Sequence, residues 1–349
     1  MSSAERARHD YPVELARACE RVGRAQSLAL VCHVNPDGDA LGSMLAMALA
    51  ADDAGVSVVA AWPGAAVGWA YRNLPGQHLV ASAREWATAA EHADVVMTFD
   101  CGSIDRLAEL APSVARAAQR GALIVVDHHL TNTRFGSINV VDDNAAASSV
   151  VVRELLDKLG WPLTRDSAWC LYAALATDTG RFQFSSTTAE VFMLAAELTS
   201  HDLPIAQISR ELFEETPFAV LRLCGEVVAS AEMVLLDTVA NEPGFRVAVA
   251  TVSNEQLARF AVDVSDTEPL IDWVRRAAEA DVAVVLKQTP GGDTRGSMRS
   301  LGRVDVSRVA SALGGGGHRF AAGFTSANDV ATVRAAVLDL VGREVGGRG

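Results

Sequence analysis

In the first half of the chain, continuous apolar runs alternate with segments of helical composition. Four apolar runs of strand-like length lie at 27–33, 56–62, 94–100 and 122–127, and all but 56–62 end in polar residues. Helices are predicted over 40–54, 104–120 and 145–159, each followed directly by a glycine. Apolar strands that alternate with helices are typical of a parallel sheet covered on both faces.

The remainder of the chain changes pattern twice. The middle, 166–232, is mostly helical in composition and is interrupted by Pro204 and Pro217. Strands follow at 245–251, 281–287 and 294–300, and helices at 306–313 and 330–340. A length of 349 residues suggests two domains. We therefore predict an α/β protein with an N-terminal doubly wound, mostly parallel sheet over 1–200, a helical linker over 201–235, and a smaller α/β domain over 236–345.

The charge of the chain restricts the class of partner. There are 43 acidic and 30 basic residues, which gives a net charge of -13 with histidine neutral. A surface that binds long nucleic acid needs a basic stripe, so this balance argues against such a partner. A small phosphorylated ligand stays compatible with it, because metal ions or a local basic loop can hold one.

The sequence also indicates the cellular setting. The N-terminal residues 1–12 lack the apolar core of a signal peptide. The longest apolar helix candidate, 41–51, stops at Asp52 and Asp53, short of the ~18 residues that a membrane span needs. The five cysteines are scattered, without a C-x-x-C pair. We therefore expect a cytoplasmic protein with reduced thiols and no membrane partner.

Histidine and aspartate gather where predicted strands end. The run 33–39, His-Val-Asn-Pro-Asp-Gly-Asp, follows the first strand; Asp100 ends the third, and Asp127-His128-His129 ends the fourth. A later helical segment carries Asp178 before Gly180. In doubly wound folds, ligands bind beyond the carboxyl ends of the strands. We expect these four segments to meet at one edge of the sheet.

Each segment alone also fits an ordinary helix cap or turn. Their convergence favours a cation, because carboxylates packed together raise one another's pKa and none of these segments brings a Lys or Arg. Imidazole and carboxylate ligands without cysteine suit Mn²⁺ or a similar ion better than structural zinc. About six ligands suit two ions, ~3.5–4 Å apart and bridged by a carboxylate.

A glycine run and a basic segment lie near the C-terminal end. Four glycines, 314–317, precede His318 and let backbone N–H groups approach a phosphate or base closely, although a bare glycine run is also typical of a flexible loop. The segment 287–320 has a net charge of +4, from two aspartates and six basic residues: Lys287, Arg295, Arg299, Arg303, Arg308 and Arg319. These features favour an anionic ligand. Arg181, which follows Asp178 closely, is a further candidate phosphate contact.

Together these motifs resemble those of the DHH phosphoesterase family. The run 33–39, Asp100, Asp127-His128-His129 and Asp178 look like its four motifs, and 314–323 looks like the signature of the DHH-associated C-terminal domain. The resemblance covers essentially the whole chain. Size and domain pair are most similar to the bacterial oligoribonucleases that also act as 3′-phosphoadenosine 5′-phosphate (PAP) phosphatases, the NrnA type, some of which hydrolyse cyclic di-AMP.

The resemblance implies a role for each motif residue. Two Mn²⁺ ions per active site are expected, the first bound by His33 and Asp37, the second by Asp39, His128 and Asp178, with Asp100 as the bridge. The resemblance also implies that His129 faces the substrate phosphate and that Asp127 orients an imidazole. It assigns the distal end of the substrate to Arg299, Gly315, Gly316, Gly317 and His318.

The function implied is Mn²⁺-dependent hydrolysis of dinucleotides and other short oligoribonucleotides, PAP or cyclic di-AMP, and relatives imply a homodimer. A pyrophosphatase or polyphosphatase would share the metal motifs but lack the glycine run. A single-strand DNA exonuclease would be longer and carry a basic groove. A nucleotide sensor without activity would have lost one or more ligands.

Overall fold

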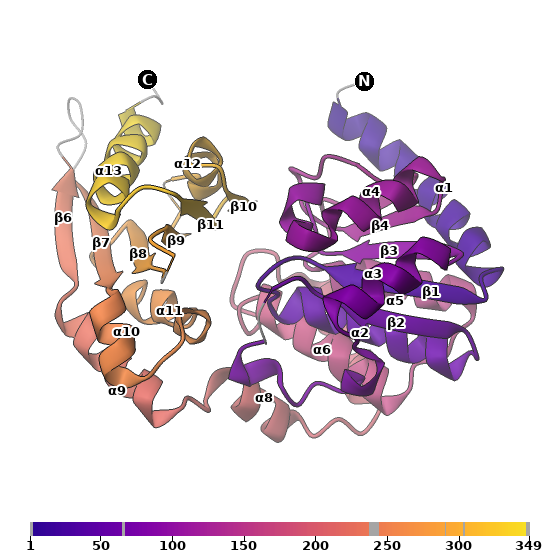
Figure 1. Ribbon diagram of the computed structural model, residues 1–349. Helices are drawn as coiled ribbons and strands as arrows, with labels where there is room; N and C mark the ends of the chain where they lie inside the picture. The colour runs from indigo at the N-terminus through magenta and orange to yellow at the C-terminus, as the bar shows by residue number, and fades with distance from the viewer. Residues whose placement is uncertain (1–2, 65–66, 237–243, 290, 303, 347–349) are drawn as a thin grey trace. The chain divides into compact units, whose positions relative to one another are not determined.

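The computed structural model describes residues 3–64, 67–236, 244–289, 291–302 and 304–346 (Figure 1). Two compact units divide the chain, Met1–Glu215 and Thr216–Gly349. The segment expected as a linker, 201–235, contributes α8 (Ile205–Phe213) to the first unit and α9 (Phe218–Ala229) to the second. Its role as a linker stays a prediction.

The first unit is built on a parallel sheet of five strands in the order β2-β1-β3-β4-β5. These strands are β1 (Ser27–Cys32), β2 (Ser57–Ala61), β3 (Val95–Phe99), β4 (Leu123–Asp127) and β5 (Ile138–Val141). The helices are α1 (Ser3–Gly23), α2 (Gly38–Asp53), α3 (Ala83–His92), α4 (Ala111–Gln119), α5 (Ser148–Leu159), α6 (Arg165–Asp178), α7 (Ala189–Thr199) and α8. Short 3₁₀ turns lie at η1 (Trp69–Tyr71), η2 (Gln77–Leu79) and η3 (Ile104–Leu110).

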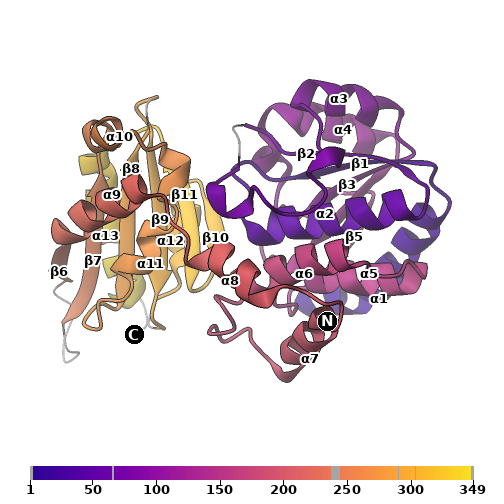
Figure 2. The ribbon, with the colours of Figure 1, turned by 90° about the horizontal axis from the view of Figure 1, so that it is seen from below.

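Two apolar cores cover the two faces of this sheet. Alternate residues of β1 divide between them: Leu28 and Leu30 pack in the core with α1, α2 and α5, whereas Ala29 and Val31 pack in the core with α3 and α4. Figure 2 shows α3 and α4 on one side of the sheet and α2, α5 and α6 on the other. Most residues of the central strands are thereby withdrawn from water on both faces, which is why these strands are almost entirely apolar.

The strand order places a topological switch between β1 and β3. From β1 the chain crosses to β2 on one side and later to β3 on the other, so that the loops after β1 and β3 separate. In open parallel sheets such a switch leaves a crevice beyond the carboxyl ends of the two strands. His33 and Asp100 are the residues that immediately follow these two strands.

The helices α2 and α6 pack in close contact because α2 carries glycine at two positions. A Cβ on Gly38 would overlap the side chain of Thr177, and a Cβ on Gly42 would overlap the carbonyl oxygen of Cys170 and lie 2.8 Å from Ala174 Cβ. Side chains at these positions would hold the helices apart. The contact brings the start of α2 beside the end of α6, where Asp178 lies.

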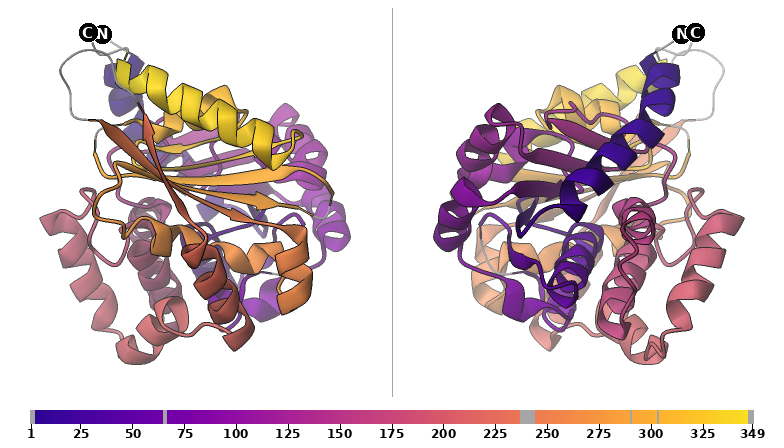
Figure 3. Two further views of the ribbon diagram at one scale, coloured as in Figure 1. Left: turned by 90° about the vertical axis from the view of Figure 1, so that its left-hand side faces the viewer. Right: turned by 90° about the vertical axis from the view of Figure 1, so that its right-hand side faces the viewer.

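The second unit is a sheet of six strands in the order β10-β11-β9-β8-β7-β6, in which β7 and β8 are parallel and the other neighbours antiparallel. The strands are β6 (Glu232–Leu236), β7 (Phe245–Val252), β8 (Val282–Gln288), β9 (Thr294–Ser300), β10 (Gly316–His318) and β11 (Ala321–Ser326). The helical segments are α9, α10 (Asn254–Phe260), η4 (Val264–Thr267), α11 (Leu270–Val274), α12 (Val306–Ala312) and α13 (Val330–Gly346). Figure 3 shows α13 across one face of the sheet and α9 to α11 on the other.

The predicted α/β class and the parallel N-terminal sheet are confirmed. The helix expected over 104–120 is instead two segments, η3 and α4, because Ala108 has φ 42° and Pro112 opens α4. The sequence analysis missed α1, α3, α10, α11, β5, β6, β10 and β11. Among the basic residues singled out, Arg303 lies outside the described residues.

Across the described segments, no helix is both long enough and apolar enough to cross a membrane. All five cysteines are free thiols, and Cys32, Cys101, Cys170 and Cys224 are buried.

Replacing Gly42 with alanine should destabilise the first unit. The added Cβ meets main-chain atoms, which cannot rotate away, and overpacking of this kind costs about 1–3 kcal/mol. Gly225→Ala is the matched control, because a Cβ there meets nothing within 4 Å and lies inside a helix. Chemical denaturation should show a lower midpoint for Gly42→Ala and an equal or higher one for Gly225→Ala. Equal midpoints for Gly42→Ala and the unchanged protein would refute the close helix contact.

Candidate functional site

Five carboxylates and three imidazoles of the first unit come together beyond the strand ends. His33 follows β1, Asp37 caps the N-terminus of α2, and Asp39 lies in the first turn of that helix. Asp100 follows β3 in the left-handed region, with φ 53°, a conformation that aspartate tolerates better than most residues. The short segments that follow β1 and β3 therefore place these side chains at the same edge of the sheet.

One group of ligand atoms consists of His33, Asp37 and Asp100, whose donor atoms all lie within 4.8 Å of one another. His33 Nε2 is 3.5 Å from Asp100 Oδ2. His33 and Asp100 are buried, and Asp37 is exposed at the rim. This group therefore faces a ligand that can enter from the Asp37 side.

A second group consists of Asp39, His128 and Asp178. His128 Nε2 lies 3.7 Å from Asp39 Oδ2, 3.4 Å from Asp178 Oδ2 and 3.5 Å from Asp100 Oδ1. The ring is oriented by its other nitrogen, since Nδ1 is 3.1 Å from the carbonyl oxygen of Ala145. One nitrogen thus points into a ring of three carboxylates.

Asp100 belongs to both groups through different oxygens. Its Oδ2 faces His33 and its Oδ1 faces His128, each at 3.5 Å. A carboxylate that presents one oxygen to each of two ligand sets has the geometry of a bridge between two ions.

The donor set fits divalent cations. Ligands that are about 2.1 Å from a shared ion lie about 3 Å from one another, close to the 3.4–3.7 Å separations around His128. All the donor atoms are oxygen or imidazole nitrogen, which suit divalent ions such as Mn²⁺, Mg²⁺ and Zn²⁺ better than soft metal ions. The described residues therefore provide two adjacent candidate cation sites.

Helix α5 positions Asp39 from behind. Asp39 accepts hydrogen bonds from the backbone N–H of Ser148 at 2.6 Å and of Ser149 at 3.1 Å, both in the first turn of α5. The Ser43 hydroxyl donates to the same carboxylate at 3.0 Å. Ser148 Oγ also donates to Asp100 Oδ1 at 3.1 Å, so one helix N-terminus fixes two of the acidic ligands.

Without a cation the carboxylates of the site are in electrostatic conflict. Burial, followed by repulsion from Asp100 and Asp178, raises the pKa of Asp39 well above its usual range. Burial likewise raises the pKa of Asp178 to about 6, although His128 partly offsets it. Burial would raise the pKa of Asp100 too, but the neighbouring imidazoles, His129 foremost, hold it below its usual range. Bound divalent ions would remove this repulsion.

His129 lies beside both Asp127 and Asp100, and its Nδ1 is 3.4 Å from Asp100 Oδ1. Its Nδ1 lies 2.7 Å from Asp127 Oδ1, and the fully buried Asp127 also accepts from the N–H of His128 and from the Asn132 amide. Burial would lower the pKa of His129, but the Asp127 and Asp100 carboxylates raise it to about 10. Asp127 thus orients this imidazole and favours its charged form.

Arg181 is engaged elsewhere in the first unit. Its guanidinium donates to the carbonyl oxygen of Phe213 at 3.1 Å, lies 3.5 Å from Glu214 and stacks 4.5 Å from the centroid of the Phe213 ring. The expected contact with a phosphate therefore stays a prediction, and it requires this side chain to leave the end of α8.

In the second unit, Arg299 and His318 lie in one row across three strands. His318 of β10 pairs with Ala321 of β11, and Ala321 pairs in turn with Arg299 of β9. Paired residues share a face of the sheet, so both side chains stand on the same face. Gly315, Gly316 and Gly317 precede His318 along the chain; Gly316 pairs with Gly323 and Gly317 with Ala322, and a Cβ at Gly315 would overlap the backbone of Gly323.

The sequence analysis did not single out the buried Lys287 as part of a pair. Lys287 lies opposite Arg295 on neighbouring strands, is fully buried, and has its Nζ 2.7 Å from Glu268 Oε1. Burial lowers the pKa of Lys287, and Glu268 partly restores it. The Lys287 ammonium in turn holds the pKa of Glu268 below its usual range, against the effect of burial. The sequence signal for this pair was a lysine inside a predicted strand. The partner, Glu268, lies in a turn distant along the chain, and no sequence pattern connects the two residues.

Three other contributors were also missed. Ser148, Asn132 and Arg106 hold site residues through side-chain or backbone groups. Ser148 could have been found, because it lies in the first turn of the predicted helix 145–159. Asn132 and Arg106 carry no pattern that separates them from ordinary loop residues.

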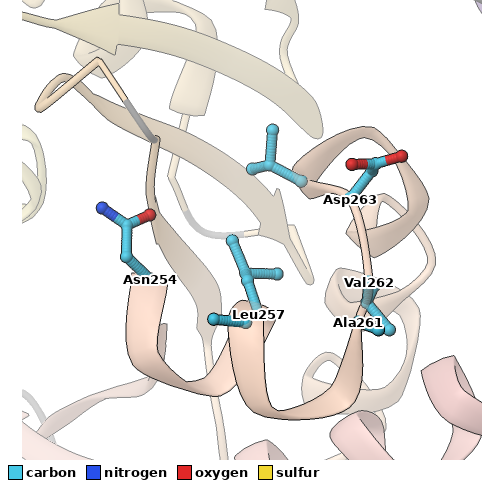
Figure 4. Close-up of a pocket in the computed structure, with 7 residues that line it drawn as sticks. Asn254, Leu257, Ala261, Val262 and Asp263 are labelled. Carbon is cyan, nitrogen blue, oxygen red and sulfur yellow. The ribbon is translucent and has the colours of Figure 1, made fainter.

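The second unit also has a shallow recess of about 640 Å³ beside α10 (Figure 4). Asn254, Leu257, Ala261, Val262 and Asp263 line it, with two neighbouring residues. None of the residues predicted for the site lies in its lining, so the recess is separate from the cluster of carboxylates and imidazoles.

Comparison with known proteins gives matches along most of the chain. Residues 27–175 match the DHH family, N-terminal domain, and residues 244–346 match the DHHA1 domain. A bifunctional oligoribonuclease and PAP phosphatase NrnA of Thermus thermophilus is 33% identical over 85% of this chain and 83% of its own length. A probable bifunctional oligoribonuclease and PAP phosphatase NrnA of Streptococcus mutans is 24% identical over 84% of this chain and 87% of its own.

A solved structure of similar fold is the crystal structure of an exopolyphosphatase-related protein from Bacteroides fragilis. It aligns with a TM-score of 0.83 and 23% identity, over 96% of this chain and 98% of that one. The same two-part α/β fold therefore occurs in both proteins.

Removing the Glu268 carboxylate should destabilise the second unit. Glu268→Gln leaves the buried Lys287 ammonium without its carboxylate partner, whereas Glu279→Gln changes an exposed acidic residue and is the control. Since the pKa of Glu268 is depressed below its usual 4.5, the pair stabilises the fold above that pH and the stability is lost as pH falls through the lowered pKa. Denaturation midpoints measured from pH 7 to 3 should differ between the unchanged protein and Glu268→Gln at pH 7 and converge at the acidic end. A constant difference across this range would show that the ion pair contributes nothing.

Proposed function

The chain belongs to the DHH family and is an enzyme of the hydrolase class, and from this premise we propose that it is a Mn²⁺-dependent phosphoesterase of short nucleotides. The substrates proposed are dinucleotides and other short oligoribonucleotides, PAP, and cyclic di-AMP together with its linear product. The names of the Thermus thermophilus and Streptococcus mutans relatives support the first two classes.

The observation that carries the proposal is the placement of Asp100. With one oxygen toward His33 and the other toward His128, it joins two ligand groups into one centre. In this proposal His33 and Asp37 hold the first ion, Asp39, His128 and Asp178 hold the second, and Asp100 bridges them. Four carboxylates would then balance the charge of two divalent ions.

When bound, two such ions neutralise the phosphoryl oxygens and lower the pKa of a coordinated water so that it attacks phosphorus at neutral pH. The residues of the chain have to hold this centre rigid. The hydrogen bonds from Ser148 and Ser149 to Asp39 do so from the N-terminus of α5. Outer contacts of this kind set the orientation and basicity of the ligands.

His129 is proposed as the group that compensates the negative charge developing on the phosphoryl group or on the leaving oxygen. The Asp127 carboxylate orients the ring by its contact at Nδ1 and raises its pKa, and in this proposal Nε2 is the nitrogen that faces the substrate. As water bonds to phosphorus and loses a proton, the bond from phosphorus to the 3′-oxygen breaks. A proton from the His129 imidazolium then passes to that leaving oxygen, or the ring stabilises the phosphoryl charge.

The far end of a substrate is assigned to the second unit. Arg299 and His318 supply a guanidinium and an imidazole on one face of a sheet, and Gly315, Gly316 and Gly317 supply half-buried backbone without side chains, a combination that suits a phosphate and a base. A homodimer and Arg181 as a phosphate contact remain part of the proposal.

Initial rates with separate substrates test this function. The protein is freed of metal, reloaded with Mn²⁺, and given a diribonucleotide, PAP, cyclic di-AMP, its linear dinucleotide, single-stranded DNA or pyrophosphate. Hydrolysis of the diribonucleotide or PAP that depends on Mn²⁺ is the expected result. Turnover of pyrophosphate or long DNA alone would overturn the proposal.

The bridging role of Asp100 predicts a general loss of turnover in Asp100→Asn. Asparagine tolerates the same positive φ and is nearly the same size, so the fold should survive while the second anionic oxygen is lost. The rate should fall at least about 100-fold on every substrate, since even residues that merely orient a ligand have effects of 10–100-fold. Asp53→Asn, at the exposed end of α2, is the control and should retain full rates. An active Asp100→Asn variant would exclude the bridge.

Arg299→Ala should raise KM without a comparable loss of kcat. A charged hydrogen bond to a ligand contributes about 1.5–3 kcal/mol, and Arg299 lies on a different unit from the proposed reacting centre. Arg308→Ala, which removes an exposed arginine paired with Glu344, is the control. Steady-state kinetics on PAP would measure both constants; an unchanged KM in Arg299→Ala would remove this residue from the binding site.

A further inference from the structure

Arg106, in the 3₁₀ turn η3, places a guanidinium against the first ligand group. Its Nη2 is 3.0 Å from Nδ1 of His33, the residue whose Nε2 faces Asp100. Its main chain is part of the same structure, since the Val34 N–H donates to the Arg106 carbonyl oxygen at 2.9 Å. Arg106 is thus anchored through its backbone to the loop that carries His33, with its side chain exposed at the rim.

The charge of Arg106 is not neutralised within the described segments. Other arginines of the first unit form ion pairs: Arg116 with Glu91, Arg153 with Glu197, and Arg181 with Glu214. Arg106 forms none with a described Asp or Glu, although the His33 ring that it contacts is grouped with the carboxylates of Asp37 and Asp100. A permanently charged guanidinium whose side-chain contact is an imidazole and not a carboxylate is positioned for an external anion.

Nδ1 of His33 lies within hydrogen-bonding distance of two groups, and it can form a hydrogen bond with only one of them at a time. Besides Arg106, Nδ1 is 2.9 Å from the carbonyl oxygen of Val34. A nitrogen that carries its hydrogen donates to the carbonyl; a nitrogen without it accepts from the guanidinium. If Nε2 of a neutral ring binds a cation, the hydrogen must lie on Nδ1, and the Val34 carbonyl is then the partner.

We propose that Arg106 is a phosphate-binding residue of the active site, which is released from His33 when the first ligand group holds its cation and then binds an oxygen of the substrate phosphoryl group. This inference rests on the proposed function for the identity of the substrate. The ligand class is a phosphate monoester or diester beside the first ion.

The charge balance of the site supports an anion at this place. Two divalent ions would only cancel the carboxylates of Asp37, Asp39, Asp100 and Asp178, and would leave the centre without net attraction for a phosphate. Arg106 adds one positive charge on the side of His33, and the imidazolium of His129 adds one near Asp127. The scissile phosphate would then lie between two cationic groups as well as two ions.

The variants Arg106→Met and Arg106→Lys separate this role from a structural one. Both keep the backbone carbonyl that anchors Val34, and methionine keeps much of the side-chain volume without charge. Arg116→Met is the matched control, since it removes a half-exposed arginine of the same unit. Calorimetric titration with Mn²⁺ alone measures the ligand groups, and titration with inorganic phosphate, with and without Mn²⁺, measures the anion site.

The expected result is that Arg106→Met weakens phosphate binding to the Mn²⁺-loaded protein by about 10- to 100-fold, the fold-change of a charged hydrogen bond. Arg106→Lys should lie between, and Arg116→Met should match the unchanged protein. Binding of Mn²⁺ alone should be unchanged or tighter in Arg106→Met, because a cation beside the ligand group is removed. In the protein without metal the variants should not differ in phosphate affinity.

Equal phosphate affinity in Arg106→Met and the unchanged protein would overturn the inference, and so would a loss of Mn²⁺ affinity that accounts for the whole effect. Absence of phosphate binding in the unchanged, loaded protein would overturn it as well. Phosphate binding that depends on Arg106, without hydrolysis of any nucleotide, would refute the proposed function and leave the inference standing. In an active enzyme, Arg106→Met should raise KM for a diribonucleotide by a similar factor.

Discussion

The mutual repulsion of buried carboxylates is the constraint around which the first unit is built. Asp39, Asp100 and Asp127 are almost completely buried, and Asp37 and Asp178 complete the same cluster. Such a group of like charges costs free energy unless hydrogen bonds, imidazoles and cations compensate it. Each of these is provided for: the N-terminus of α5 for Asp39, Asn132 for Asp127, and His33 and His128 beside Asp100.

The fold supplies this compensation because of how its elements meet. The switch between β1 and β3 separates two loops and opens the edge at which their first residues, His33 and Asp100, face each other. Gly38 and Gly42 allow α6 to approach α2 closely, which carries Asp178 to the Asp39 side of the centre. The edge that carries the candidate site is made from four separate segments and therefore depends on packing contacts well behind it.

Much of this could be predicted from the sequence, for physical reasons that differ by residue. His33, Asp100 and Asp127 follow continuous apolar runs, so the rule for parallel sheets places them on one edge. Asp178 ends a helix, and only its motif connected it with the others. Arg106 and Asn132 could not be predicted, because they act through contacts between loops that no periodicity encodes. The break at Ala108 was missed for the same reason, and α1 because its polar first turns obscure the apolar face that packs through Leu15, Ala18 and Val22.

The net charge of -13 is not spread evenly over the structure. Part of it is concentrated at the proposed ion sites, and the basic segment of the second unit includes a buried Lys287 and two arginines on one face of β9.

The measurement that tests the central claim most directly is electron paramagnetic resonance of the Mn²⁺-loaded protein, with metal content determined on the same sample. A carboxylate-bridged centre predicts two Mn²⁺ per chain and the spectrum of an exchange-coupled pair. One Mn²⁺ per chain, or two that give only the signal of isolated ions, would contradict the account.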